Sequence, residues 1–238
     1  MKSRLPLWQG RFALAALFCP SCFLTACAPA RQASVRPGIN AEYRDPDVDK
    51  WIERFETESR EIYKDRNQIV AEVGLRRADY VADIGAGTGV FTFLFAEKVG
   101  PRGRVWAVDI VPEFLELVRT RAAERKLSNV HTVLCSEVSA KLPSDSIDVA
   151  FLCDTYHHLE YPASTLASIH RALRTRGQLI VIDFKRIEGV SRQWVLDHVR
   201  AGQDVVIQEI ESAGFELLEI AETPYLDENY FLRFRKKG

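Results

Sequence analysis

The stretch Val81-Ala-Asp-Ile-Gly-Ala-Gly-Thr-Gly89 joins a short apolar run to three glycines at alternate positions. The apolar run predicts a buried strand at Tyr80–Ile84, and the residues from 88 to 99 have helical spacing. Glycine lets a backbone turn sharply and approach a ligand closely, because no Cβ intervenes. In open parallel sheets, ligands bind at the carboxyl ends of the strands. The stretch therefore predicts a ligand-binding loop at the end of the first strand of such a sheet.

The alternation of strand and helix continues along the chain. Apolar runs predict six more strands, at Arg104–Asp109, 130–135, Ile147–Cys153, 178–184, 215–221 and 230–234. Helical patterns separate most of these runs, which indicates a parallel sheet covered by helices on both faces. The last two strands have no helix between them, so they are expected to form an antiparallel hairpin at one edge. The predicted fold class is α/β, with a seven-stranded, mostly parallel sheet.

Acidic residues beside the glycine loop narrow the kind of ligand. Asp83 lies two residues before the first glycine, where a carboxylate would repel a pyrophosphate but suit a cationic group such as an amino-acid ammonium. Val90 stands where a G-x-G-x-x-G phosphate fingerprint has its last glycine. Asp109 ends the second predicted strand and could accept hydrogen bonds from both ribose hydroxyls. These residues indicate a nucleoside ligand with a positively charged part.

Together these motifs resemble those of class I S-adenosylmethionine-dependent methyltransferases. The resemblance runs from about residue 62 to 234 and includes the Leu142-Pro143 turn before the fourth strand. It implies a Rossmann-like fold and S-adenosyl-L-methionine as the cofactor. Relatives often carry an aspartate before the Leu-Pro turn that bonds the adenine amino group, and this chain has Ser136 and Glu137 there instead. The resemblance implies cofactor binding by Asp83, Gly85, Gly87, Gly89, Asp109, Ile110, and either Glu137 or Ser136.

The end of the fourth strand supplies the candidate catalytic residues. Asp154, Tyr156, His157 and His158 follow it, and this position borders both donor and acceptor in the family that the chain resembles. A histidine can titrate near neutral pH and act as a base. The alternative is that the histidine pair only shapes the loop by hydrogen bonding. Adjacent histidines need further ligands to hold a metal, and the sequence does not indicate any, so no metal site is predicted.

A finer resemblance, to a bacterial subgroup of the same family, concerns three segments. They are the run from residue 51 to 63, the Tyr156-His157-His158 element and a late His198-Val199-Arg200. The early helix could cap the donor as a lid, or it could simply pack against the domain as an N-terminal helix.

The N-terminus has the order of a signal peptide. Lys2, Arg4 and Arg11 precede an uncharged apolar run from residue 12 to 26. The run ends in Leu24-Thr25-Ala26-Cys27, which resembles the lipobox of bacterial lipoproteins and implies Cys27 as a lipid anchor. An uncleaved apolar anchor, a wrongly assigned start codon and a cytoplasmic protein are the alternatives. We expect residues 1–27 to be the signal peptide, 28–49 a flexible tether, and 50–238 a methyltransferase domain.

The composition limits the partners of the chain. Its 238 residues carry a formal net charge of −1, so no bulk electrostatic attraction to nucleic acid is expected. The predicted function is in-line transfer of a methyl group to a small-molecule acceptor. The alternatives are a membrane-tethered S-adenosylmethionine-binding protein without catalysis and an NAD(P)-dependent oxidoreductase. Export of the chain would separate it from S-adenosylmethionine, which is made in the cytosol.

Overall fold

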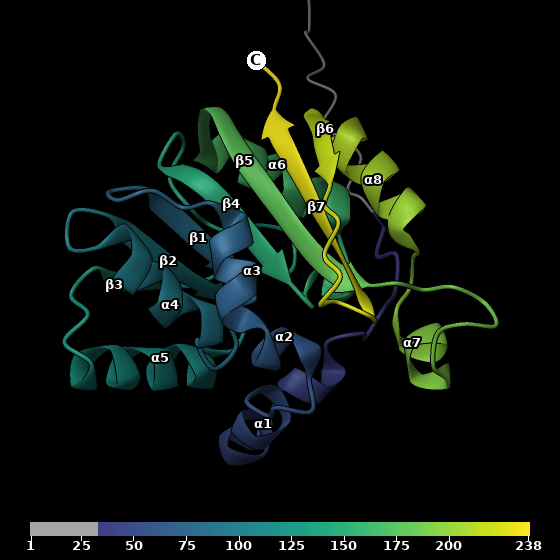
Figure 1. The fold of residues 1–238 in the computed structure, drawn as a ribbon, viewed down its shortest axis with the longest axis horizontal. Coiled ribbons are helices and arrows are strands. Elements are labelled where there is room, and N and C mark those ends of the chain that lie inside the picture. Colours follow the sequence, from purple (N-terminus) through teal and green to yellow (C-terminus); the bar gives the residue numbers. More distant parts are fainter. Residues whose placement is uncertain (1–32) are drawn as a thin grey trace, which may run out of the picture. The chain divides into compact units, whose positions relative to one another are not determined.

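A computed structural model describes residues 33–238, and the predicted signal peptide with Cys27 lies outside the described residues. Seven strands form one sheet in the order β3-β2-β1-β4-β5-β7-β6 (Figure 1). The strands are β1 (Tyr80–Ile84), β2 (Arg104–Asp109), β3 (Val130–Leu134), β4 (Ile147–Cys153), β5 (Leu173–Phe184), β6 (Phe215–Ile220) and β7 (Asn229–Lys236). The first five run parallel, and β7 pairs antiparallel with both β5 and β6. The predicted fold class, including the C-terminal antiparallel hairpin, is confirmed.

Helices cover both faces of this sheet. Along β1, Val81 packs in a hydrophobic cluster with α3 (Arg66–Val73) and α4 (Val90–Val99). Ala82 packs in another cluster, with α6 (Pro162–Ala172) and α8 (Gln203–Ser212). Successive strand residues point to opposite faces, which explains why strands covered on both sides are apolar throughout. The α-helices are α1 (Val48–Phe55), α2 (Glu61–Lys64), α3 (Arg66–Val73), α4 (Val90–Val99), α5 (Pro112–Glu124), α6 (Pro162–Ala172), α7 (Gln193–His198) and α8 (Gln203–Ser212); short 3-10 helices are η1 (Ala41–Tyr43) and η2 (Tyr156–His158).

The part of the expected tether that the structure describes, residues 33–49, is folded against the domain. Tyr43 stacks on Trp51 with ring centroids 4.6 Å apart, and Ile39 is buried. The Asn40 amide donates a hydrogen bond to the backbone carbonyl of His158, at 3.1 Å. The polar composition predicts a flexible segment. In the structure, the Tyr43–Trp51 stack and hydrogen bonds from Asn40 and Gly38 hold it against the domain.

Three short helices lie where the parallel strands end. Figure 1 shows α1, α2 and α7 beneath the sheet, at the end towards which β4 and β5 point. This is the end at which open α/β sheets bind ligands. Within residues 33–238, no helix has both the length and the apolar character needed to cross a bilayer.

A partly buried ion pair ties η2 to α8. The Glu209 carboxylate accepts a hydrogen bond from the Tyr156 hydroxyl at 2.8 Å and two from the Arg200 guanidinium, at 2.9 and 2.7 Å. The Arg200 side chain is only 9% exposed, so loss of its partner would leave a charge with little access to water. Breaking such a pair on one side is strongly destabilising.

We therefore expect Glu209→Ala to lower the free energy of unfolding by about 2–4 kcal/mol, measured by urea denaturation. Glu211→Ala, which removes an exposed carboxylate from the same helix, is the control and should change it by less than about 0.5 kcal/mol. Equal stability of the two variants would show that the Glu209 contacts do not hold η2.

Candidate functional site

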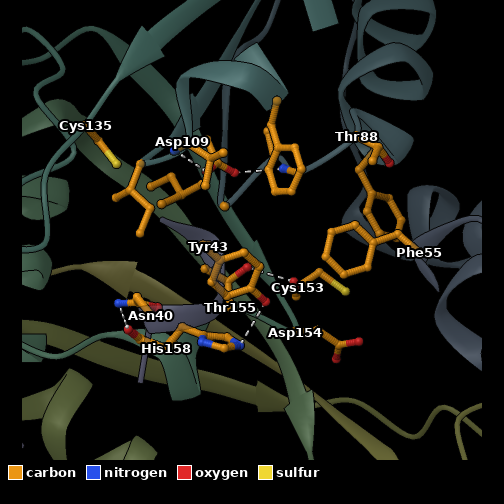
Figure 2. A pocket seen from close by; sticks show the side chains of 18 of the residues that line it. Asn40, Tyr43, Phe55, Thr88, Asp109, Cys135, Cys153, Asp154, Thr155 and His158 are labelled. Carbon is orange, nitrogen blue, oxygen red and sulfur yellow. Dashed lines mark hydrogen bonds between the residues drawn. The ribbon is translucent and has the colours of Figure 1, made fainter. Parts of the chain in front are cut away.

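A pocket opens at the carboxyl ends of the parallel strands. It contains about 1090 Å³ of empty space when its open mouth is included, and its walls combine apolar side chains with a few polar groups, as small-molecule sites do. One wall is the glycine loop after β1, and another is formed by the ends of β2 and β4. The N-terminal segment contributes Asn40, Tyr43 and Phe55 (Figure 2). The pocket can therefore accommodate a small organic ligand between the sheet and this segment.

The glycine loop leaves no room for side chains. Gly85 and Gly87 have φ angles of +76° and +52°, in the left-handed region that favours glycine. A Cβ added to Gly85 would lie 2.3 Å from the Thr155 hydroxyl oxygen, and one on Gly87 would lie 3.2 Å from the Phe55 ring. The loop backbone is therefore the surface that a ligand would contact.

Asp109 fastens this loop to the end of β2. Its Oδ2 accepts a hydrogen bond from the Gly87 amide at 2.8 Å, and its Oδ1 accepts one from the Val111 amide at 2.9 Å. Each carboxylate oxygen has a second lone pair and can still accept a hydrogen bond from a hydroxyl group. Burial raises the pKa of Asp109 to about 6, so the group is mostly ionised at neutral pH.

The cofactor-side candidates divide into two groups. Gly85, Gly87, Asp109, Ile110, Ser136 and Glu137 line the pocket. Asp83 and Gly89 do not. Asp83 is buried behind the loop and accepts a hydrogen bond from the Thr92 hydroxyl at 2.6 Å, while a Cβ on Gly89 would lie 2.7 Å from the Phe93 ring. These two residues shape the loop from behind.

On the opposite side of the pocket, Asp154 and His158 are present as the sequence suggests. Asp154 has a φ of +48°, which is uncommon for a residue with a side chain. It forms an ion pair with Arg60 and accepts a hydrogen bond from the Asn229 amide at 2.6 Å. His158 Nε2 lies 3.4 Å from the Tyr43 hydroxyl, and Figure 2 shows the two groups pointing towards one another.

Tyr156 and His157, also expected among the catalytic residues, are not among the residues that line the pocket. Tyr156 is fully buried and its hydroxyl donates to Glu209, so its position supports a structural role instead of contact with the acceptor. His157 is 4% exposed, and its Nδ1 lies 2.7 Å from Asp183 Oδ1.

Several pocket residues were not singled out as site residues from the sequence. Asn40 and Tyr43 lie in the segment expected to be a tether, and Thr155 lies between two candidates without having been one. Arg60, part of the early segment, pairs with Asp154 across 94 positions. One feature of the sequence could have pointed to this segment. Trp51 and Phe55 are four positions apart, which places them on one helical face, and Tyr43 adds a third aromatic ring nearby.

A family model described as "Methyltransferase domain" matches residues 75–228, about two thirds of the chain. The chain belongs to this family. The matched region contains the glycine loop, Asp109 and the residues that follow β4, and it leaves out the N-terminal segment that closes the pocket.

Relatives of known name are consistent with this membership. A ubiquinone/menaquinone biosynthesis C-methyltransferase, UbiE, from Burkholderia mallei is 29% identical over 118 residues, which are 50% of this chain and 48% of that protein. The chain thus matches about half the length of these curated relatives. An S-adenosylmethionine-dependent methyltransferase from Aquifex aeolicus superposes with a TM-score of 0.71 at 23% identity, covering 80% of this chain and 99% of that one.

The fold alone does not fix the chemistry. The [4+2]-cyclase SpnF superposes with a TM-score of 0.62 at 19% identity, covering 73% of this chain and 80% of that one. One fold can carry different reactions, so the activity of this methyltransferase domain has to be argued from its pocket.

The buried Asp83 should make stability depend on pH. Burial raises the pKa of Asp83 to about 7, with the nearby Asp109 acting in the same direction. Between about pH 4 and 7 the folded protein then holds a proton that the unfolded chain has lost, so stability should fall as pH rises through this window. We expect the loss attributable to Asp83 to be about 2–4 kcal/mol, measured by denaturation at several pH values.

Asp83→Asn should remove this part of the pH dependence, whereas Asp204→Asn, at an exposed site on α8, should preserve it. Identical pH profiles for wild type and Asp83→Asn would contradict the account.

Proposed function

We propose that this chain transfers a methyl group from S-adenosylmethionine to a small-molecule acceptor. The observation that carries the proposal is the Asp109 carboxylate, which lies in the pocket wall, holds the glycine loop and keeps lone pairs free for hydroxyl donors. A ribose offers two such donors. The family membership and the names of the relatives support the same activity.

The pocket fits a cationic adenosyl ligand better than a dinucleotide. Asp109 and Asp154 both line it, and the pocket-lining Arg60 is already paired with Asp154. A pyrophosphate would meet carboxylates with little free positive charge, whereas a sulfonium and an ammonium would be attracted. This charge arrangement favours the methyltransferase over the NAD(P)-dependent oxidoreductase.

The donor, when bound, supplies a methyl group already activated on a sulfonium. The residues of the chain then have to hold the acceptor in line with that methyl group and exclude water, since positioning accounts for much of the rate. Asp154 is placed to accept a hydrogen bond or a proton from the acceptor, because Arg60 and Asn229 fix its carboxylate at the pocket wall. The Tyr43 and Phe55 rings cover the same space from the N-terminal side.

The lining also supports a small acceptor with an apolar or aromatic body. Ile62, Phe91, Phe114 and Leu159 line the pocket together with the two covering rings. Apolar walls with a few polar groups are typical of sites for small organic ligands. UbiE is named for a C-methylation in ubiquinone and menaquinone biosynthesis, so a quinone-like ring is a suitable first acceptor to test.

For its location, we propose membrane attachment through a lipid on Cys27. The support is the order of basic residues, apolar run and Leu24-Thr25-Ala26-Cys27 in the sequence. In bacteria grown with labelled palmitate, the full-length chain should take up label, and Cys27→Ser should not. Equal labelling of the two chains, or none in either, would refute the anchor.

The donor site is tested by calorimetric titration of the full-length chain with S-adenosylmethionine and with S-adenosylhomocysteine. We expect binding to the wild type, and Asp109→Ala should weaken it at least about 10-fold because hydrogen bonds to a charged group are lost. Glu113→Ala, an exposed carboxylate on α5, is the matched control and should bind normally. Thermal unfolding of each variant without ligand checks that the fold is intact.

Because Glu137 is exposed, its replacement by alanine should not disturb the fold. Several-fold weaker binding in Glu137→Ala would assign it to the adenine. If NADH binds and neither adenosyl ligand does, the proposed function is wrong. If the donor binds but no labelled methyl group reaches any acceptor, the non-catalytic binding protein is the better description.

A further inference from the structure

Three histidines meet beside the pocket. His157 and His158 belong to η2, directly after β4, and His198 is the last residue of α7, after β5. One ring nitrogen from each can be chosen so that all three lie within 4.8 Å of one another. The chain has five histidines, and the other two, His131 and His170, lie elsewhere in the domain. The sequence did not indicate this third histidine as a partner for the pair, because 40 positions separate it from His158.

The spacing suits a single metal ion. His158 Nε2 and His198 Nε2 are 3.5 Å apart, and the ring centroids of the three residues are 4.3, 5.1 and 5.2 Å apart. Two nitrogens bound to one tetrahedral zinc at about 2.0–2.1 Å lie roughly 3.3 Å from each other. The described arrangement therefore needs only small ring movements to place three nitrogens around one ion.

Asp183 orients one of the three rings. Its Oδ1 lies 2.7 Å from His157 Nδ1, and its Oδ2 accepts a hydrogen bond from the His157 backbone amide at 2.9 Å. A ring that donates Nδ1–H to a carboxylate keeps a lone pair on Nε2. Histidines that bind metals usually have their other ring nitrogen held in this way.

The His158 ring makes no hydrogen bond of normal length with another side chain among the described residues. Among residues 33–238, the buried His158 Nδ1 has no hydrogen-bond partner, and both contacts of Nε2 are long, at 3.4 Å to Tyr43 and 3.5 Å to His198. Buried polar groups normally have a partner. The third ring is fixed by stacking on Trp194 at 4.6 Å, which places it against an apolar neighbour.

We propose that His157, His158 and His198 bind one divalent transition metal ion of the zinc class, with Asp183 as the carboxylate that orients His157. Three protein nitrogens plus an open position are the arrangement of catalytic zinc sites. His158 also lines the pocket on the side of Asp154, so the ion would lie by the acceptor, where it could polarise an oxygen atom of that molecule. Only this last role rests on the proposed function; binding of the ion does not.

The experiment uses the full-length chain freed of metal with a chelator. Calorimetry with Zn²⁺ should give one ion per chain, and Co²⁺ should produce the strong visible absorption of a four-coordinate site. His198→Ala should reduce Zn²⁺ affinity at least 100-fold, and Asp183→Asn about 10- to 100-fold. All variants keep the same five cysteines, so a thiol site would not respond to these changes.

His131→Ala, a histidine on β3 outside the cluster, is the control and should bind as the wild type does. Thermal unfolding without metal shows whether each variant folds, and His198→Gln replaces His198→Ala if that variant does not. Absence of stoichiometric binding in the wild type, or equal affinity in the His198 and His131 variants, would overturn the proposal. The same samples are also titrated with S-adenosylmethionine. A chain that binds this donor but not Zn²⁺ would contradict the metal site and leave the methyltransferase proposal intact.

Discussion

One carboxylate couples the two strands on which the pocket depends. Asp109, at the end of β2, accepts hydrogen bonds from the amides of Gly87 and Val111, so it joins the loop after β1 to the start of the segment leading into α5. Because both strands are parallel neighbours, their carboxyl ends meet and the loop cannot move independently of β2. Gly85 and Gly87 have positive φ angles in this loop, which glycine adopts easily because it has no Cβ.

The second constraint is the N-terminal segment, residues 33–55, which covers one side of the pocket. Residues from 33 to the end of α1 lie outside the family match, yet Asn40, Tyr43 and Phe55 form part of the pocket wall. Contacts with distant parts of the chain hold this segment. The Val35 and Gly38 amides donate hydrogen bonds to Glu160, and Arg36 donates one to the Asp197 carbonyl. The Tyr43, Trp51 and Phe55 rings pack against Phe114. In this position the segment shields one side of the pocket from water.

Much of the fold followed from the sequence, and the reasons are specific. Apolar runs located all seven strands because parallel strands are covered on both faces, and the missing helix between β6 and β7 predicted the hairpin. The sequence placed Gly85, Gly87, Asp109 and Asp154 at the pocket because loop glycines and strand ends have fixed places in this architecture. Asn40 and Tyr43 were missed because the segment is polar and contains proline, and its anchoring partners, such as Glu160 and Phe114, are distant in the sequence. That Tyr156 lies outside the pocket wall could not be predicted, because its hydroxyl partner Glu209 comes from α8, 53 positions further along the chain.

The central claim is that an adenosyl ligand lies between the glycine loop and the N-terminal cover. A crystal structure of the chain with S-adenosylhomocysteine tests it most directly. The account predicts that the ribose hydroxyls lie within hydrogen-bond distance of the Asp109 carboxylate, with the amino-acid part beside Gly85 and Gly87 and the Tyr43 and Phe55 rings above. A ligand bound elsewhere, with Asp109 contacting only its two backbone amides, would contradict the account.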